Sequence, residues 1–325
     1  MTASIVLETG GETVAINSEL AWVSRLLHDC ADGAVSSQPG KITLAIHVEE
    51  TSQAFEVSGL APLARKAWSG SKEIVIADAC SSGFDVRLNV GGAHPEFTYR
   101  WRPGFGRSVA RFLLPARFLL LAREVLLHYP VLWWSSIRGR VPLHAVACTV
   151  GERVVLLAGP GGVGKSTLLR LELAGGGHAT SDNLCVADGE SVWGLVEPMR
   201  VDGDHGRRTS HRRVEVSLEG RVPRLSPDHV VVVRRGNGDT AKLVRCDSET
   251  AARSLVTGTY MAGELSRFWG YAATLGAGTG MGPSHPAVTE TASAFASRLD
   301  CFELCLPRWR GLRLADALQH AGATS

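Results

Sequence analysis

The first hundred residues contain several short segments in which apolar and polar side chains alternate. This two-residue period is typical of half-buried strands. Strands are predicted at Lys41–Glu49, Glu73–Asp78, Phe84–Val90 and Phe97–Trp101, and a short helix at Ala21–Cys30. The pattern therefore indicates a small mixed α+β domain over residues 1–105, and this domain carries no recognisable chemical motif.

The most apolar stretch of the chain follows, at Val109–Trp134. A membrane-spanning helix needs about 20 residues almost free of charge, but here Pro115 interrupts the run. Three arginines, spaced six residues apart, would point in different directions around a helix: Arg111, Arg117 and Arg123. We therefore expect a buried or half-buried helical connector over residues 106–140 and no membrane span, with the polar residues 135–140 marking its end. A position on a membrane surface is the alternative.

Residues 141–325 combine continuous apolar runs with helical patterns, which predicts an α/β domain. Arg153–Ala158 is almost wholly apolar, as a central strand buried on both faces would be. Further strands are predicted at Pro142–Val150, Asn183–Ala187, His229–Arg235 and Cys301–Leu306. Helices are predicted at Lys165–Ala174, Ser248–Leu255, Gly263–Ala273 and Ala292–Leu299, and a glycine-rich loop at Thr274–Pro286.

Composition restricts the classes of partner. Lysine and arginine total 34 against 32 acidic residues, and this net charge of +2 gives no argument for binding nucleic acid or a membrane. The seven cysteines have scattered spacing without a C-x-x-C pair, which favours reduced thiols over a zinc site or disulfides. The chain begins without a basic segment followed by an apolar run, so no signal peptide is predicted and a cytoplasmic location is expected.

The chemistry is concentrated in one glycine-rich segment, which matches the P-loop pattern G-x-x-x-x-G-K-[ST] at every fixed position. An apolar strand precedes it and a helical pattern follows it, as phosphate binding at a helix N-terminus requires. Lys165 is expected at the β- and γ-phosphates, and the Ser166 hydroxyl on Mg²⁺. The predicted cofactor-binding residues, for ATP, are Gly159, Gly161, Gly162, Val163, Gly164, Lys165, Ser166 and Thr167.

An acidic residue follows the P-loop early. Asp182 lies 16 residues after Ser166, where the chain would return from the helix to the next strand of the same sheet. A carboxylate at that point can accept a proton from an attacking hydroxyl or help to hold the metal ion. The spacing alone also fits a residue that only turns the chain.

The order of these features resembles the catalytic domain of HPr kinase/phosphorylase and its relatives, which include kinases that tailor ribosomally made peptides such as lasso peptides. That family has a strand with a histidine, then a P-loop, then a G-H-x-x-x-D-D segment. This chain has His144, 22 residues before Ser166, and it reads G-H-A-T-S-D-N over Gly177–Asn183. The resemblance covers about residues 141–235. It implies a P-loop-containing HPr-kinase-like C-terminal domain preceded by the small N-terminal domain.

The resemblance also implies roles for individual residues. Asp182 would be the general base on a serine or threonine hydroxyl, and His144 would lie near the phosphate, although a core histidine is the structural alternative. Mg²⁺ would be bound by Ser166, Asp182 and Asn183. Asn183 stands where the family has a second aspartate, so a negative charge is lost from the metal site. The substrate would be a peptide or small protein, and a homo-oligomer is consistent with the family.

Two further segments are candidates for the site. Glu197-Pro198-Met199-Arg200 corresponds loosely to a family segment that contacts substrate and phosphate. The basic stretch Asp202–Arg213 is either a solvated loop or one whose arginines close over the phosphates.

Three functions follow from these observations. The first is an ATP-dependent kinase acting on a peptide or protein hydroxyl. The second is a scaffold that keeps the kinase fold but not its activity, which Asn183 motivates. The third is an ATPase or switch of another P-loop class. It is the least favoured, because no distant strand ends in an acid and His229–Arg235 ends in arginines.

Overall fold

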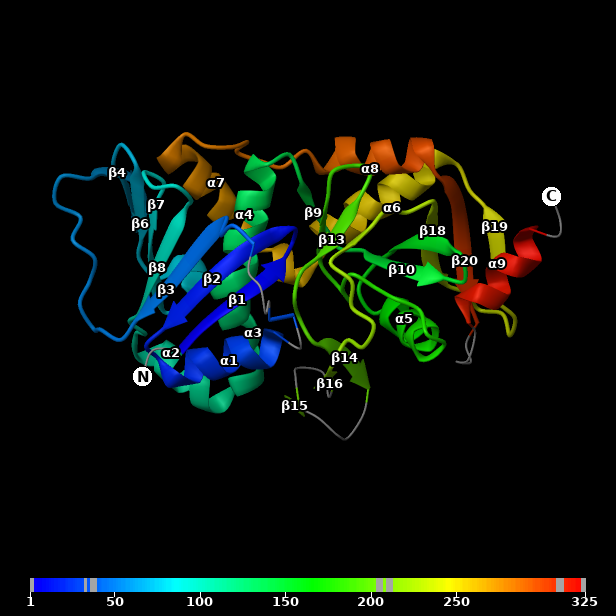
Figure 1. Ribbon diagram of the computed structural model, residues 1–325, viewed down its shortest axis with the longest axis horizontal. Coiled ribbons are helices and arrows are strands. Elements are labelled where there is room, and N and C mark those ends of the chain that lie inside the picture. The colour runs from blue at the N-terminus through cyan, green and yellow to red at the C-terminus, as the bar shows by residue number, and fades with distance from the viewer. Residues whose placement is uncertain are drawn as a thin grey trace. The chain divides into compact units, whose positions relative to one another are not determined.

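The computed structural model describes residues 3–31, 34–35, 40–202, 207–208, 213–307 and 313–322. It has a mixed α/β architecture with several sheets and helices (Figure 1). The chain forms two compact units. Most of the first consists of Met1–Gly139 and Arg267–Pro286, and most of the second of Arg140–Arg207, Arg213–Ser266 and Ala287–Ser325.

The first unit is built on an eight-stranded sheet with the order β1-β2-β3-β8-β7-β6-β5-β4. Its strands are β1 (Ala3–Thr9), β2 (Glu12–Ser18), β3 (Leu44–Glu49), β4 (Ala61–Ala64), β5 (Ala67–Ser69), β6 (Glu73–Ile76), β7 (Phe84–Asn89) and β8 (Glu96–Trp101). The four predicted strands are confirmed as β3, β6, β7 and β8, with ends that differ by up to three residues. In β7 and β8, the apolar side chains of the alternating pattern are buried: Phe84, Val86 and Leu88 in β7, and Phe97 and Tyr99 in β8.

The helices of the first unit include the predicted apolar stretch. They are α1 (Ala21–Ala31), η1 (Ala79–Ser81), α2 (Phe105–Leu113), α3 (Pro115–Arg123), the π-helical turn η2 (Glu124–His128), α4 (Tyr129–Ile137) and α7 (Phe268–Thr279). Pro115 starts α3 at a position where its missing N–H costs nothing. Helix α4 ends at Ile137, within the polar residues 135–140 that were predicted to mark the end of the connector. The buried hydroxyls of Ser135 and Ser136 donate to the backbone carbonyls of Gly10 and Leu132. Among the described residues, no helix combines the length and the apolar character needed to cross a bilayer.

Helix α7 corrects the prediction of a loop at Thr274–Pro286. The segment is helical through Thr279, and only the residues after it form a loop. A Cβ atom on Gly278 would overlap the side chain of Ile74 and would lie 3.1 Å from Leu63 Cδ2. This glycine therefore permits close packing of a helix on the sheet and does not mark a turn.

The second unit contains a five-stranded sheet with the order β10-β11-β18-β20-β19. Its strands are β10 (Val146–Val150), β11 (Arg153–Ala158), β18 (His229–Arg235), β19 (Lys242–Arg245) and β20 (Asp300–Leu306). The three central strands β11, β18 and β20 run parallel. The apolar runs of β11 and β18 are buried on both faces, as predicted for Arg153–Ala158.

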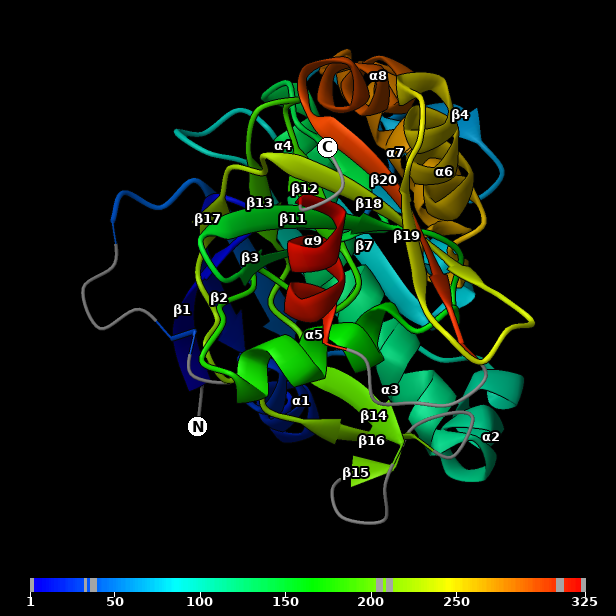
Figure 2. The ribbon, with the colours of Figure 1, turned by 90° about the vertical axis from the view of Figure 1, so that its right-hand side faces the viewer.

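Helices cover both faces of this sheet (Figure 2). They are α5 (Lys165–Ala174), α6 (Ser248–Tyr260), η4 (Gly263–Leu265), α8 (Val288–Arg298) and α9 (Leu314–Gly322). Helices α5 and α9 lie on one face, and α6 and α8 on the other. Leu157, Val231 and Leu304 point into the core shared with α5 and α9. Helix α5 has the predicted bounds, and Gly175 is its C-cap residue.

Two smaller sheets complete the second unit. One has the order β17-β13-β12-β9 and the other β14-β16-β15. Their strands are β9 (Val141–Leu143), β12 (Cys185–Ala187), β13 (Val192–Gly194), β17 (Arg224–Leu225), β14 (Met199–Asp202), β15 (Arg207–Arg208) and β16 (Arg213–Val216). The strand after α5 is therefore not the next strand of the sheet that contains β11, which corrects that prediction.

The single strand predicted at Pro142–Val150 is also wrong, because it divides into β9 and β10 of two different sheets. The division lies at His144, whose backbone N–H donates to Thr259 Oγ1 on α6 at 3.1 Å and not to a neighbouring strand. All seven cysteines lie within the described residues, and none of them forms a disulfide.

Candidate functional site

The glycine-rich loop joins the end of β11 to the start of α5. Gly159 and Gly164 adopt φ angles of +139° and +121°, which favour glycine. A Cβ atom on Gly159 would lie 2.7 Å from the carbonyl oxygen of Val233, and one on Gly164 would lie 2.8 Å from Leu306 Cδ1. Gly164 precedes the first turn of α5 and no side chain caps that end. The first N–H groups of α5 are therefore available to an anion.

Lys165 is the first residue of α5, and its side chain folds back over the loop. The Nζ atom donates to the carbonyl oxygens of Gly159 at 2.7 Å and Pro160 at 3.2 Å. Burial lowers the pKa of Lys165 to about 8, although the carboxylates of Asp182 and Glu264 act in the opposite direction. The ammonium group is thus mostly charged at neutral pH, and it lies beside the loop where a phosphate would neutralise it.

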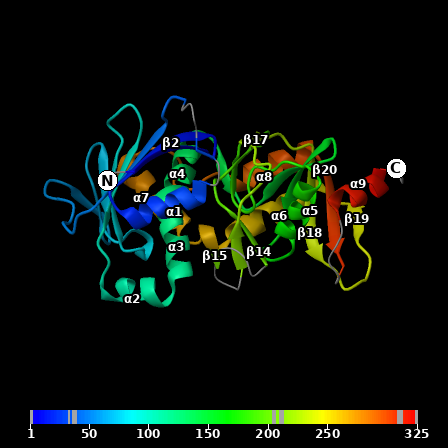
Figure 3. The same cartoon turned by 60° about the horizontal axis from the view of Figure 1, so that its bottom comes forward.

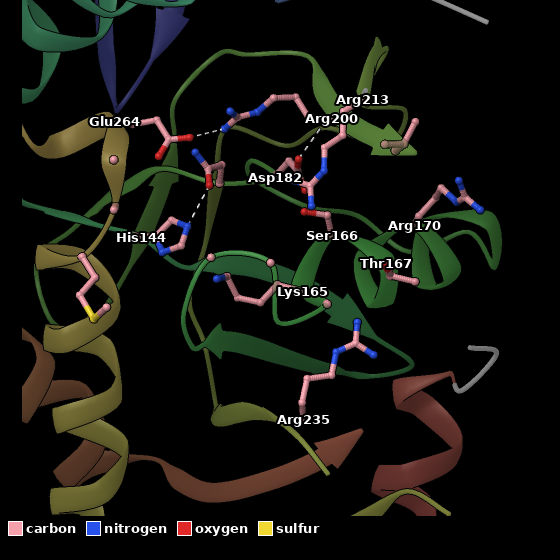
Figure 4. Close-up of a pocket in the computed structure, with 18 of the residues that line it drawn as sticks. His144, Lys165, Ser166, Thr167, Arg170, Asp182, Arg200, Arg213, Arg235 and Glu264 are labelled. Carbon is pink, nitrogen blue, oxygen red and sulfur yellow. Dashed lines mark hydrogen bonds and ion pairs between the residues drawn. The ribbon is translucent and has the colours of Figure 1, made fainter. Parts of the chain in front are cut away.

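A cavity of about 400 Å³ opens over this loop (Figure 4). Its lining comes wholly from the second unit. Of the predicted cofactor-binding residues, it is lined by Gly161, Gly162, Gly164, Lys165, Ser166 and Thr167. The other two support the loop from behind: the Gly159 carbonyl accepts from Lys165, and Val163 packs in the hydrophobic core.

Asp182 lines the same cavity, in the segment that leads from α5 to β12. Its side chain is buried, and Oδ2 accepts from the backbone N–H of Arg200 at 3.1 Å. Oδ1 is also buried but has no hydrogen-bond partner. A buried carboxylate oxygen without a donor is costly. This atom is therefore suited to a ligand that enters the cavity, such as a metal ion or a hydroxyl group.

His144 and Asn183 form a pair at the edge of the cavity. His144 Nε2 lies 2.9 Å from Asn183 Oδ1 (Figure 4). Burial, followed by the nearby Lys165 ammonium, lowers the pKa of His144 to about 4, so its imidazole is neutral at pH 7. With an amide oxygen as partner, Nε2 carries the proton. His144 therefore orients Asn183 and brings no positive charge to the cavity.

The predicted metal ligands fit Mg²⁺ in part. Ser166 and Asp182 both line the cavity, and the unpartnered Asp182 Oδ1 is a suitable oxygen donor. Asn183 Oδ1 instead faces His144, so the third predicted ligand is already engaged. The described part of the chain has no group of three or more His, Cys, Asp or Glu residues that could hold a metal. Mg²⁺ bound to a nucleotide needs only one or two protein carboxylates beside the phosphates and water.

Four arginines line the cavity: Arg170, Arg200, Arg213 and Arg235. Arg200 and Arg213 belong to the two segments named as candidates from the sequence, whereas Arg170 and Arg235 were not predicted as site residues. Arg235 is the last residue of β18, and Arg170 lies on α5. From the loosely matching segment, Arg200 lines the cavity, whereas Glu197 is absent from its lining and accepts from the backbone N–H of Leu184. Most of the basic stretch Asp202–Arg213 lies outside the described residues.

Glu264 is a site residue that sequence reasoning missed. It lies on the short turn η4, and its Oε1 is 2.7 Å from Nη2 of Arg200. Burial acts to raise its pKa, but the Arg200 guanidinium outweighs it and holds the pKa at about 2. Glu264 therefore stays ionised and fixes Arg200 at the rim of the cavity. Its segment had been predicted as plain helix, and no motif set this carboxylate apart.

The cavity thus combines a helix N-terminus, a lysine, a carboxylate with a free oxygen and several guanidinium groups. This set can hold a polyphosphate and a divalent cation next to a general base. A scan against models of protein families and a search of curated proteins both find no match to this chain.

Proposed function

We propose that this chain binds ATP with Mg²⁺ and transfers the γ-phosphoryl group to a serine or threonine hydroxyl of a peptide or small protein. One observation supports this proposal more strongly than the others. Asp182 lines the same cavity as Lys165 and the glycine-rich loop, and its buried Oδ1 has no hydrogen-bond partner. A phosphate-binding loop alone would fit many nucleotide-binding proteins, whereas the adjacent base favours transfer to a hydroxyl.

Each residue has a role in this proposal. The loop glycines and the N-terminus of α5 bind the phosphates as a P-loop does, and Lys165 turns from the Gly159 carbonyl to the β- and γ-phosphates. Ser166 and Asp182 hold Mg²⁺, which when bound offsets the charge of the phosphates. Asp182 accepts the proton of the attacking hydroxyl. Arg200, fixed by Glu264, and the other arginines stabilise charge on the group in transfer.

We also propose that the second unit is related to HPr kinase/phosphorylase. The support is the order of His144, the glycine-rich loop and the Gly177–Asn183 segment along the chain, together with their common cavity. The change to Asn183 leaves the first carboxylate as the base and removes one charge from the metal site.

The first experiment needs no knowledge of the acceptor. Water can replace the acceptor hydroxyl, so wild-type protein with MgATP should release phosphate slowly, as measured by a colorimetric phosphate assay. The Asp182→Asn variant should release about 100-fold less, while calorimetry shows binding of ATP in the absence of Mg²⁺ almost unchanged. Asp239→Asn, at an exposed turn, is the matched control and should behave as wild type.

A second experiment tests transfer directly. The protein is incubated with γ-labelled ATP, Mg²⁺ and a mixture of peptides that each contain one serine or threonine. Labelled peptide from wild type but not from Asp182→Asn supports the kinase. Phosphate release without labelled peptide favours an ATPase.

The alternative is a scaffold that keeps the fold and binds a precursor peptide or a partner enzyme. Asn183 favours it, because the predicted metal ligands then include a single carboxylate, and His144 engages the Asn183 amide oxygen that could stand in for a second one. Binding of ATP without phosphate release and without labelled peptide would support this alternative and contradict the kinase.

A further inference from the structure

Helix α2 in the first unit has its apolar stripe on the outside. Phe105, Val109, Phe112 and Leu113 follow the spacing i, i+4, i+7, i+8 that places side chains on one face of a helix. In a globular protein this face normally packs on the core. Here Phe105 is 88% exposed, Phe112 82% and Leu113 73%, and Leu114 just after the helix is also exposed.

The next helix, α3, buries its aromatic side chain, so the outward-facing apolar side chains are specific to α2. In α3, Phe118 is buried, and its ring lies 5.5 Å from that of Trp22 and 5.2 Å from that of Trp101. Helix α2 meets the same aromatic cluster through its polar side, because the Arg111 guanidinium lies 4.8 Å over the Trp22 ring. That contact directs the arginine towards the unit, whereas Phe105 and Phe112 are exposed. Helix α2 is labelled in Figure 3.

The charged residues of the segment that carries the stripe are all basic: residues 102–123 include five arginines and no aspartate or glutamate. Arg102 pairs with Asp85 and Arg123 is buried, so neither adds to the charge at the surface. Arg117, on the first turns of α3, is exposed. An apolar helix face beside exposed cations is the pattern that binds the surface of an anionic bilayer, where the apolar side chains enter the acyl boundary and the cations meet the lipid phosphates.

We propose that α2 and the turn into α3 bind the surface of an anionic lipid bilayer. Phe105, Phe112 and Leu113 enter the boundary between headgroups and acyl chains, and Arg117 contacts the headgroup phosphates. The helix lies in the plane of the surface, because its nine residues span only about 14 Å against about 30 Å of hydrocarbon. The proposal does not depend on the nucleotide site.

A second copy of the chain fits the surface less well. A helix of nine residues cannot supply the roughly 800 Å² from each partner that a stable dimer buries. Two copies of the same stripe would also bring like charges together. A bilayer needs no matching shape and supplies the opposite charge.

The test is sedimentation of the full-length protein with vesicles of phosphatidylcholine alone or mixed equally with phosphatidylglycerol. We expect binding to the mixed vesicles only, weakened at high salt. The double variant F112D/L113D should bind at least about tenfold more weakly, Arg117→Gln should bind more weakly, and Phe112→Trp should bind as wild type. Val244→Asp adds a charge at an exposed apolar residue elsewhere and serves as the control.

Three results would overturn the proposal. The first is equal sedimentation of wild type and F112D/L113D. The second is a wild-type oligomer, detected by light scattering, that becomes monomeric in F112D/L113D while neither protein binds vesicles; this would assign the stripe to a second copy. The third is a large fall in melting temperature of F112D/L113D without vesicle binding by wild type, which would show that the stripe packs within the protein. Lys165→Ala should sediment as wild type, so failure of the nucleotide proposal leaves this one intact.

Discussion

Lys165 is a cation held in a buried position, and its pKa of about 8 would make the proposed phosphate binding dependent on pH. A bound phosphate favours the charged ammonium and raises its pKa in the complex. Above pH 8 the free protein must therefore take up a proton on binding. We expect the affinity for ATP to be constant near pH 7 and to weaken by up to about tenfold per pH unit above pH 8.

Calorimetry between pH 7 and pH 9.5 measures this dependence. Lys165→Arg is the control, because the guanidinium stays charged throughout the range. Its affinity will be lower but should not change with pH. The same slope in both proteins would assign the effect to another group.

His144 gives a second prediction at the scale of one residue, which concerns the loss of folding stability at acidic pH. Its pKa in the folded protein is about 4, lowered first by burial and then by Lys165, while the unfolded chain titrates near its ordinary value of about 6.5. Between these values the unfolded state binds more protons. The contribution to stability is thus complete above about pH 6.5 and is lost as the pH falls towards 4.

Urea unfolding at pH 7 and pH 4.5 tests this prediction. Other groups also titrate in this window, so the quantity to compare is the loss of stability in wild type against that in His144→Gln. The variant should lose less on acidification. An equal loss would mean that His144 is protonated in the fold.

At the scale of elements, the stability of the strand–loop–helix segment should depend on Gly159, which is tightly packed, and much less on Gly161, which is not. Gly159→Ala would place a methyl group 2.7 Å from the Val233 carbonyl at a φ of +139°, and we expect it to cost about 1–3 kcal/mol. Gly161→Ala meets no atom within 4 Å and has no positive φ, so its cost should be small. Urea unfolding of the two variants gives the comparison. Equal costs would contradict the tight packing of the loop against β18.

The elements also show what a sequence can predict. The bounds of β11, α5 and β18 agree with the prediction because continuous apolar runs and flanking glycines are local signals. The break at His144 could not be predicted, since its partner Thr259 is 115 residues away.

The residues of the candidate site also fall into two groups, those that the sequence could predict and those that it could not. The loop and Lys165 belong to a motif with fixed spacing, Asp182 belongs to the Gly177–Asn183 segment that follows it, and all of them line one cavity. Glu264 reaches that cavity only because η4 packs beside Arg200, and an isolated carboxylate in a helical pattern has no spacing to reveal it. The arginines on α5 and β18 are likewise ordinary surface residues until the fold brings them to the rim.

At the scale of the molecule, each unit has its own buried core, and the proposed ligand binds within one of them. A ligand at 100 times its Kd stabilises the state that it binds by about 2.7 kcal/mol. We therefore expect saturating MgATP to slow amide hydrogen exchange in β11 and α5, and to leave β7 and β8 of the first unit unchanged. Lys165→Ala should abolish the protection. Equal protection of both units would contradict a site confined to the second.

The place of α7 in the chain affects how the protein is made. This helix packs on β4, β5 and β6, yet it is encoded about 190 residues after β6, behind most of the second unit. While the ribosome synthesises that intervening length, the strands have been made but their covering helix has not. The apolar sheet surface around Ile74 then stays exposed to solvent until residues 268–279 have left the exit tunnel of the ribosome. Chaperone binding to a stalled nascent chain should therefore depend on whether the stall falls before or after this helix.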